Sequence, residues 1–156
     1  MAFAEDLLEQ AYHLARRERN KPKQASLRRA ISTAYYALFN LLIREASSNW
    51  KNDAQRMRLA RSFEHGKMKK VSDAVVHLKF SGHDRQIVAG LKNVADAFAS
   101  LQEARHGADY DGARKWSRTE VLGIVKQADT AFGTWREIQN EAIAQDYLLS
   151  LLTGRT

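Results

Sequence analysis

The stretch from Ser26 to Glu45, SLRRAISTAYYALFNLLIRE, constrains the fold more than any other part of this sequence. Read with a helical period, it carries two neighbouring apolar stripes and leaves only a narrow polar strip. The larger stripe contains Leu27, Ile31, Ala34, Tyr35, Leu38, Leu41 and Leu42. A helix that is apolar around most of its circumference must be covered on several sides. We therefore predict that this stretch is the central helix of a bundle.

Composition supports an all-α chain. Among 156 residues there are one Pro and eight Gly, and 44% of the residues are hydrophobic. We expect a single domain over residues 1–156, folded as an up-and-down bundle of about five helices. The absence of cysteine excludes disulfides and thiolate metal sites. No apolar run reaches the roughly 20 residues of a membrane span. We expect a cytoplasmic protein without a membrane segment, metal or cofactor.

Helix boundaries follow from caps and breaks in the pattern. Asn52, Asp84 and Ser117 each precede an amphipathic segment and are predicted N-caps. The expected helices cover residues 3–19, 26–45, 53–63 and 67–79, a long segment after Asp84, and a last segment running from Ser117 through Ala142. The apolar tail at 147–152 packs either on its own chain or on a partner.

Basic residues dominate the connection between the first two helices. The formal net charge is +7, and this connection carries Arg16, Arg17, Arg19, Lys21, Lys23, Arg28 and Arg29. Such a cluster is either a solvated turn or a patch that contacts phosphates.

Arg105 interrupts the apolar pattern of the later long helix. The stripe Ile87, Leu91, Val94, Phe98 and Leu101 leads directly to it. A charged residue on a core stripe is a local conflict of the kind that occurs at functional sites. A structural role near the helix end is the alternative, and Asp109, one turn further on, can pair with the arginine in either case.

No standard catalytic signature is present, and the five histidines lack the spacing of metal ligands. Two stretches, however, carry a resemblance. The run RRAISTAYYALFN resembles the signature helix of the HEPN family, and Arg105-His106-Gly107-Ala108-Asp109-Tyr110-Asp111 is similar to the R-x-x-A-D-Y-D run of one HEPN subgroup. His65-Gly66, at the head of an intervening helix, is similar to a weaker third element.

This resemblance implies a homodimeric helical bundle. Many such proteins pair with a minimal nucleotidyltransferase in toxin–antitoxin systems. Others are metal-independent ribonucleases that use an Arg followed by four to six residues and a His. After Arg105 those positions hold Tyr110, Asp111 and Gly112, while His106 is adjacent to the arginine. Arg58 and His65 have the required spacing, but on a different segment.

Three functions therefore remain open. The chain is a module that binds RNA, a nucleotide or a nucleotidyltransferase partner, a divergent ribonuclease, or a structural adaptor. The predicted phosphate-binding residues are Arg28, Arg29, Arg105, Asp109 and Tyr110. If the protein is an enzyme, the catalytic candidates are Arg105, His106 and Tyr110, and tyrosine, with a usual pKa of about 10, is a poor general base at neutral pH.

Overall fold

The computed structural model describes residues 2–156, which fold into seven α-helices without a strand. These helices are α1 (Phe3–Ala15), α2 (Gln24–Ser47), α3 (Asp53–Ala60), α4 (His65–His77), α5 (Arg85–Tyr110), α6 (Arg118–Ile138) and α7 (Ala142–Thr153). The all-α prediction is confirmed. The expected number of about five helices is too low, because the segment expected to run from Ser117 through Ala142 is divided into α6 and α7.

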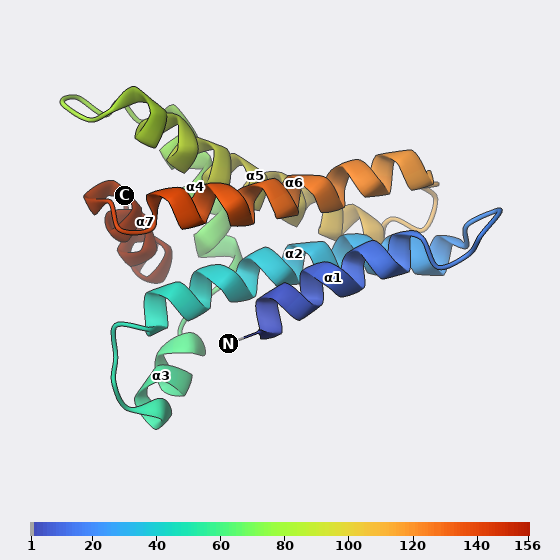
Figure 1. Cartoon of the computed structure of the whole chain (residues 1–156), viewed down its shortest axis with the longest axis horizontal. Helices are drawn as coiled ribbons and strands as arrows, with labels where there is room; N and C mark the ends of the chain where they lie inside the picture. The colour runs from blue at the N-terminus through green and yellow to red at the C-terminus, as the bar shows by residue number, and fades with distance from the viewer. Residues whose placement is uncertain (1) are drawn as a thin grey trace.

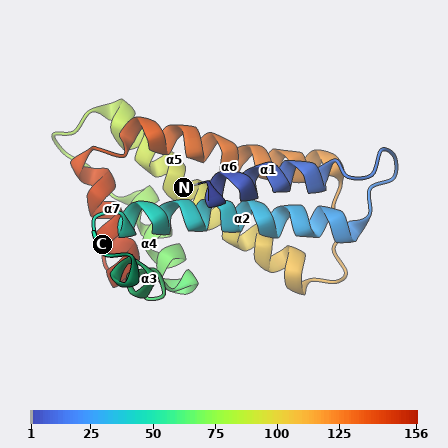
Figure 2. The same cartoon turned by 60° about the horizontal axis from the view of Figure 1, so that its bottom comes forward.

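Helix α2 is the central helix, as its sequence predicts. It packs against α1, α5 and α6 and also contacts α3 and α7. Figures 1 and 2 show α1, α2 and α6 running side by side along the long axis of the molecule. Tyr35 and Leu38 of α2 and Phe98 of α5 are fully buried, as expected. Phe39, on the neighbouring stripe, is only half-buried.

Polar contacts fasten α1 to the helices beside it. The guanidinium of Arg44 on α2 donates two hydrogen bonds to the carboxylate of Glu5, at 2.8 and 2.9 Å. This pairing lowers the pKa of Glu5. On the other side, the Tyr12 hydroxyl donates to Asp129 of α6 over 2.7 Å. Helix α1 is therefore held against both α2 and α6 by side chains as well as by apolar packing.

The C-terminal segment packs on its own chain. Helix α7 lies against α4, and its residues Ile143, Ala144, Tyr147, Leu148 and Leu151 are buried. The hydroxyl of Tyr147 lies 2.7 Å from Oγ of Ser72 on α4, and both residues are buried. The question that the sequence leaves open about residues 147–152 is thus resolved in favour of an intramolecular contact.

The three predicted N-caps are confirmed. The side chain of Asn52 accepts a hydrogen bond from the Gln55 N–H, that of Asp84 from Gln86 and Ile87, and that of Ser117 from Glu120. Some helix ends differ from the prediction. Helix α1 ends at Ala15, whereas α5 continues through Gly107 to Tyr110. No helix in the described part of the chain has the length and apolarity that a membrane span needs.

Candidate functional site

Arg105 and His65 meet on the aromatic face of α2. The guanidinium carbon of Arg105 lies 5.3 Å from the ring centroid of Tyr35 and 5.8 Å from that of Tyr36. The His65 ring stacks on Phe39, with centroids 4.2 Å apart and an angle of 18° between the rings. Three helices, α2, α4 and α5, therefore contribute to one cluster, which we call the Arg105–His65 site. It consists of Arg105, His65, Tyr35, Tyr36 and Phe39.

The helical period of α2 creates the floor of this site. Tyr35 and Phe39 are one turn apart, so their rings lie on one face, and Tyr36 is rotated toward the edge. Tyr35 is completely buried against Phe98 of α5, at 5.4 Å between ring centroids. Tyr36 and Phe39 remain half-buried. The floor is thus anchored in the core at one ring and partly open to solvent at the other two.

His65 is held by its hydrogen bond to Tyr35. It is the first residue of α4, and its Nδ1 lies 2.6 Å from the Tyr35 hydroxyl. Burial raises the pKa of Tyr35 well above its usual value, although Arg105 acts in the opposite direction. The phenol therefore stays protonated at neutral pH and can donate to Nδ1. A neutral imidazole that accepts at Nδ1 carries its own proton on Nε2.

Burial and charge act in the same direction on His65. Its pKa is lowered from the usual 6.5, mainly by burial and further by the positive charge of Arg105. At neutral pH the site accordingly contains a charged arginine beside a neutral histidine.

Arg105 has unused hydrogen-bonding capacity. Its side chain is 13% exposed, and its Nη1 lies 3.5 Å from Oδ2 of Asp109, which is long for a hydrogen bond. Oδ1 of the same carboxylate accepts from the hydroxyl of Ser32 at 2.5 Å. Nε of Arg105 is buried and has no hydrogen-bond partner among residues 2–156. The expected Arg105–Asp109 pair is therefore present but leaves donors free.

Two predicted residues lie away from this site. Tyr110 is 71% exposed and packs on His106, at 5.0 Å between ring centroids. Within the described residues, neither ring forms a hydrogen bond or a ring contact with the Arg105–His65 site. The two rings lie together at the end of α5, which follows from their spacing of four residues on a helix.

The two arginines at the start of α2 have different roles. Arg28 donates from Nη1 to the carbonyl of Ala108 at 2.7 Å and from Nη2 to the carbonyl of Arg114. Beside it, the side-chain amide of Gln24 pairs with both the N–H and the C=O of Trp116. Arg28 therefore holds the connection between α5 and α6, whereas Arg29 is exposed.

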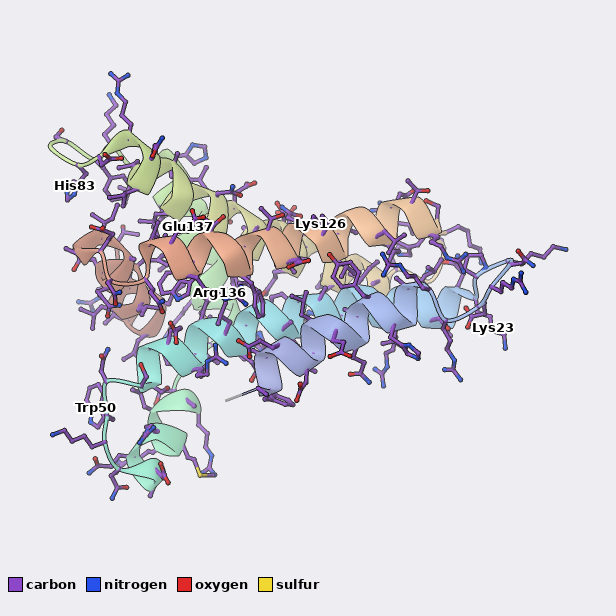
Figure 3. All side chains as sticks on the ribbon, in the orientation of Figure 1. Lys23, Trp50, His83, Lys126, Arg136 and Glu137 are labelled. Carbon is purple, nitrogen blue, oxygen red and sulfur yellow. The ribbon has the colours of Figure 1, made fainter. Side chains whose placement is uncertain are left out.

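The basic connection between α1 and α2, residues 16–23, forms a closed turn. The carboxylate of Glu18 accepts from the Lys23 N–H at 2.8 Å and from the Ser26 hydroxyl at 2.9 Å. Arg118 of α6 donates to the carbonyls of Ala15, Glu18 and Arg19. Figure 3 places Lys23 at this end of the molecule, away from Trp50 at the other end. We call this segment the basic turn.

Sequence reasoning identified Arg105 and Asp109 but not that His65 lies beside the same two tyrosine rings as Arg105. The only signals for His65 were its place in the weak third element and its spacing from Arg58. Arg58 is exposed on α3 and forms no hydrogen bond or ring contact with His65 within the described chain. The basic residue that lies near His65 is instead Arg105 of α5.

Metal-ligand clusters and similarity to known proteins were both searched for. No group of three or more His, Asp or Glu side chains within residues 2–156 is placed to bind a metal ion. Comparisons with protein-family models, with curated proteins and with solved structures found no match. The resemblance to HEPN proteins, read from the sequence, therefore stays a prediction.

Proposed function

We propose that this protein is a HEPN-like helical module that binds RNA or nucleotide phosphates at the Arg105–His65 site. The observation that carries the proposal is a partly unpaired arginine held beside a histidine on a partly exposed aromatic surface. Arginine offers a planar fork of donors that matches phosphate oxygens. Its contact to Asp109 is long at 3.5 Å, so a phosphate can compete with this carboxylate for the Nη1 group.

The partly exposed aromatic rings of the Arg105–His65 site favour a nucleic acid over a simple anion as the ligand. Tyr36 and Phe39 are half-buried beside the two basic groups. Sites that bind single-stranded nucleic acids combine positive charge with aromatic rings on which bases stack. We therefore expect an oligonucleotide to bind more tightly than inorganic phosphate.

The hydrogen bond from Tyr35 makes His65 better suited to binding a phosphate than to acting as the base in RNA cleavage. With Tyr35 donating to Nδ1, the Nε2–H group of the neutral imidazole is a hydrogen-bond donor. A donor suits a phosphate oxygen, whereas a general base needs a free lone pair. The same hydrogen bond that orients the ring thus favours a binding role.

The basic turn extends the proposed surface. Lys23 precedes Tyr35 by 12 residues, which corresponds to about 18 Å along a helix. A short oligonucleotide can reach both places, with the turn contributing charge and the Arg105–His65 site contributing stacking. Binding should then weaken steeply as salt increases, because phosphate contacts release counterions.

The test is RNA binding by an Arg105→Ala variant, measured by fluorescence anisotropy with a labelled single-stranded RNA. Loss of charged hydrogen bonds corresponds to about 1–3 kcal/mol, or a roughly 5- to 150-fold weaker affinity. Arg85→Ala is the matched control, because it removes an exposed arginine from the same helix outside the site. Circular dichroism verifies that both variants are folded. Equal affinity of the two folded variants would contradict the site, and absence of RNA binding by the wild type would favour an adaptor role.

Ribonuclease activity is the second candidate, and His65 is the observation that favours it. Cleavage requires the other tautomer, in which Nδ1–H donates to the Tyr35 oxygen and Nε2 can accept the proton of a ribose 2′-hydroxyl. Incubation of RNA with the wild type and with His65→Gln, in the presence of a chelator, tests this role. Cleavage that persists in His65→Gln would exclude His65 as the base.

The resemblance also supplies proposed partners. We infer a homodimer and a minimal nucleotidyltransferase encoded beside this chain, as parts of a toxin–antitoxin or defence system. Co-expression with the neighbouring gene product, followed by gel filtration, tests the second interaction. Separate elution of the two proteins would argue against it.

A further inference from the structure

A second site lies at the other end of the molecule, away from the basic turn. A cavity of about 160 Å³ opens between the end of α2, the helix α3 and the helix α7. Its apolar wall is formed by Ala46, Trp50, Leu59, Phe63, Leu148 and Leu149. Trp50, which Figure 3 places on the connection between α2 and α3, is 49% exposed, and Leu149 is 61% exposed. Phe63 and Leu148, in contrast, are buried.

The size and lining of the cavity define a ligand class. An apolar cavity of about 150 Å³ in another protein stays dry and accepts one benzene ring. The cavity described here has a similar volume, and no charged side chain is among its lining residues. An ion would lose its hydration there without a compensating charge. The ligand should therefore be neutral and contain one ring.

Two amides give the cavity a limited polar character. Asn49 and Gln145 are its polar lining residues. Nε2 of Gln145 donates to the carbonyl of Gln139 over 2.6 Å, which fixes that amide near the start of α7. A water molecule needs two to four polar partners to be held firmly, and this lining offers few. A ring with a single hydroxyl or N–H group matches such a lining better than water does.

We propose that this cavity binds a small neutral monocyclic compound, of the phenol class, between α2, α3 and α7. The packing of α3 supports the proposal. None of the residues of α3 is buried, and Leu59 packs only partly against the core. A ligand against Leu59 would supply contacts that the chain itself does not make. This inference does not depend on the RNA-binding proposal.

The experiment is a ligand-observed NMR titration of the full chain with phenol, toluene and benzoate. We expect saturable binding of phenol and toluene with dissociation constants of about 1 mM or lower. Benzoate should bind at least about tenfold more weakly, because its charge is not compensated. Equal binding of benzoate, or no saturation by any of the three compounds, would overturn the proposal.

A substitution that fills the cavity provides a matched test of the proposed ligand site. Ala46→Leu adds volume inside the cavity and should weaken phenol binding at least about tenfold. Ala89→Leu makes the same change at an exposed position of α5 and should leave binding unchanged. Should Ala46→Leu fail to fold, nuclear Overhauser contacts from phenol to the Trp50 and Phe63 rings of the wild type decide the question. Contacts to other residues only, or undiminished binding by folded Ala46→Leu, would contradict the proposed site.

Discussion

His65 shows how the environment of one side chain sets its chemistry. Burial and the nearby charge of Arg105 both lower its pKa, so the folded protein disfavours the imidazolium form. The unfolded chain takes up this proton near pH 6.5, whereas the folded chain takes it up only at lower pH. The contribution of His65 to stability is therefore present above pH 6.5 and is lost as the pH falls through its folded pKa.

We predict that an NMR titration of the imidazole carbons will give His65 a pKa below 6.5. Arg105→Gln should raise this pKa by removing the neighbouring charge, yet leave it below 6.5, because burial is the larger cause. An unchanged pKa of His65 in Arg105→Gln would mean that the two side chains are not electrostatically coupled.

The two phenylalanines near the site should differ in their contribution to stability. Phe98 is fully buried, so Phe98→Ala should lower the free energy of unfolding by about 3–5 kcal/mol. Phe39 is half-buried, and Phe39→Ala should cost less while removing the ring on which His65 stacks. Urea denaturation measures both changes. A larger loss for Phe39→Ala than for Phe98→Ala would contradict the observed burial.

Local contacts were predictable at this scale, but contacts between helices were not. The pair Arg105 and Asp109 follows from a spacing of four residues on one helix. The approach of His65 to Arg105 depends on how α4 and α5 pack against α2, which no periodicity in the sequence specifies. The hydrogen bonds by which Arg28 and Gln24 hold the connection between α5 and α6 could not be predicted either, because their partners are backbone atoms distant in the sequence.

At the scale of the helices, a buried polar contact joins α7 to α4. Ser72 donates to the carbonyl of Met68 within α4, and its oxygen also contacts the hydroxyl of Tyr147. Tyr147→Phe removes this hydroxyl and leaves the Ser72 oxygen with one partner fewer. We expect a loss of about 1–2 kcal/mol in the free energy of unfolding, measured by urea denaturation.

Tyr12→Phe is a useful comparison, because it removes a hydroxyl that is only partly buried. Burial of this hydroxyl and its hydrogen bond to Asp129 raise the pKa of Tyr12 to about 12. Loss of this bond should cost less than the loss at Tyr147, since solvent can satisfy Asp129. The reverse order would contradict the expectation that the more deeply buried hydroxyl of Tyr147 contributes more to stability.

Helix starts could be predicted from the sequence better than helix ends. Asn52, Asp84 and Ser117 cap helices because their side chains accept from the backbone two or three residues on. The break between α6 and α7 was missed because Ile138 and Ala142 are four residues apart and continue the helical pattern. The carbonyl of Ala15, where α1 ends, accepts from Arg118, whose place so far along the sequence gives no local signal of this contact.

At the scale of the whole molecule, assembly remains a prediction. Leu149, Trp50, Met57 and Phe3 are exposed apolar side chains, and all lie on or beside the end that carries α3. Light scattering at micromolar concentration should report about twice the chain mass of 17.7 kDa if the protein is a homodimer. Leu149→Lys should reduce the dimer fraction if this end forms the contact. If the wild-type protein is a monomer, the homodimer that the resemblance to HEPN proteins implies is wrong.

The hydrogen bonds that close the basic turn also reduce the conformational entropy that its backbone loses when a ligand binds there. Glu18 and Arg118 fix the backbone before a ligand arrives, so a polyanion need not order it. Glu18→Gln makes the chain more positive, and charge alone would then favour RNA. We expect weaker binding instead, because the amide replaces a charged acceptor and the turn becomes more mobile. Anisotropy titrations of Glu18→Gln and of Glu9→Gln, which lies outside the turn, measure whether rigidity outweighs one unit of charge.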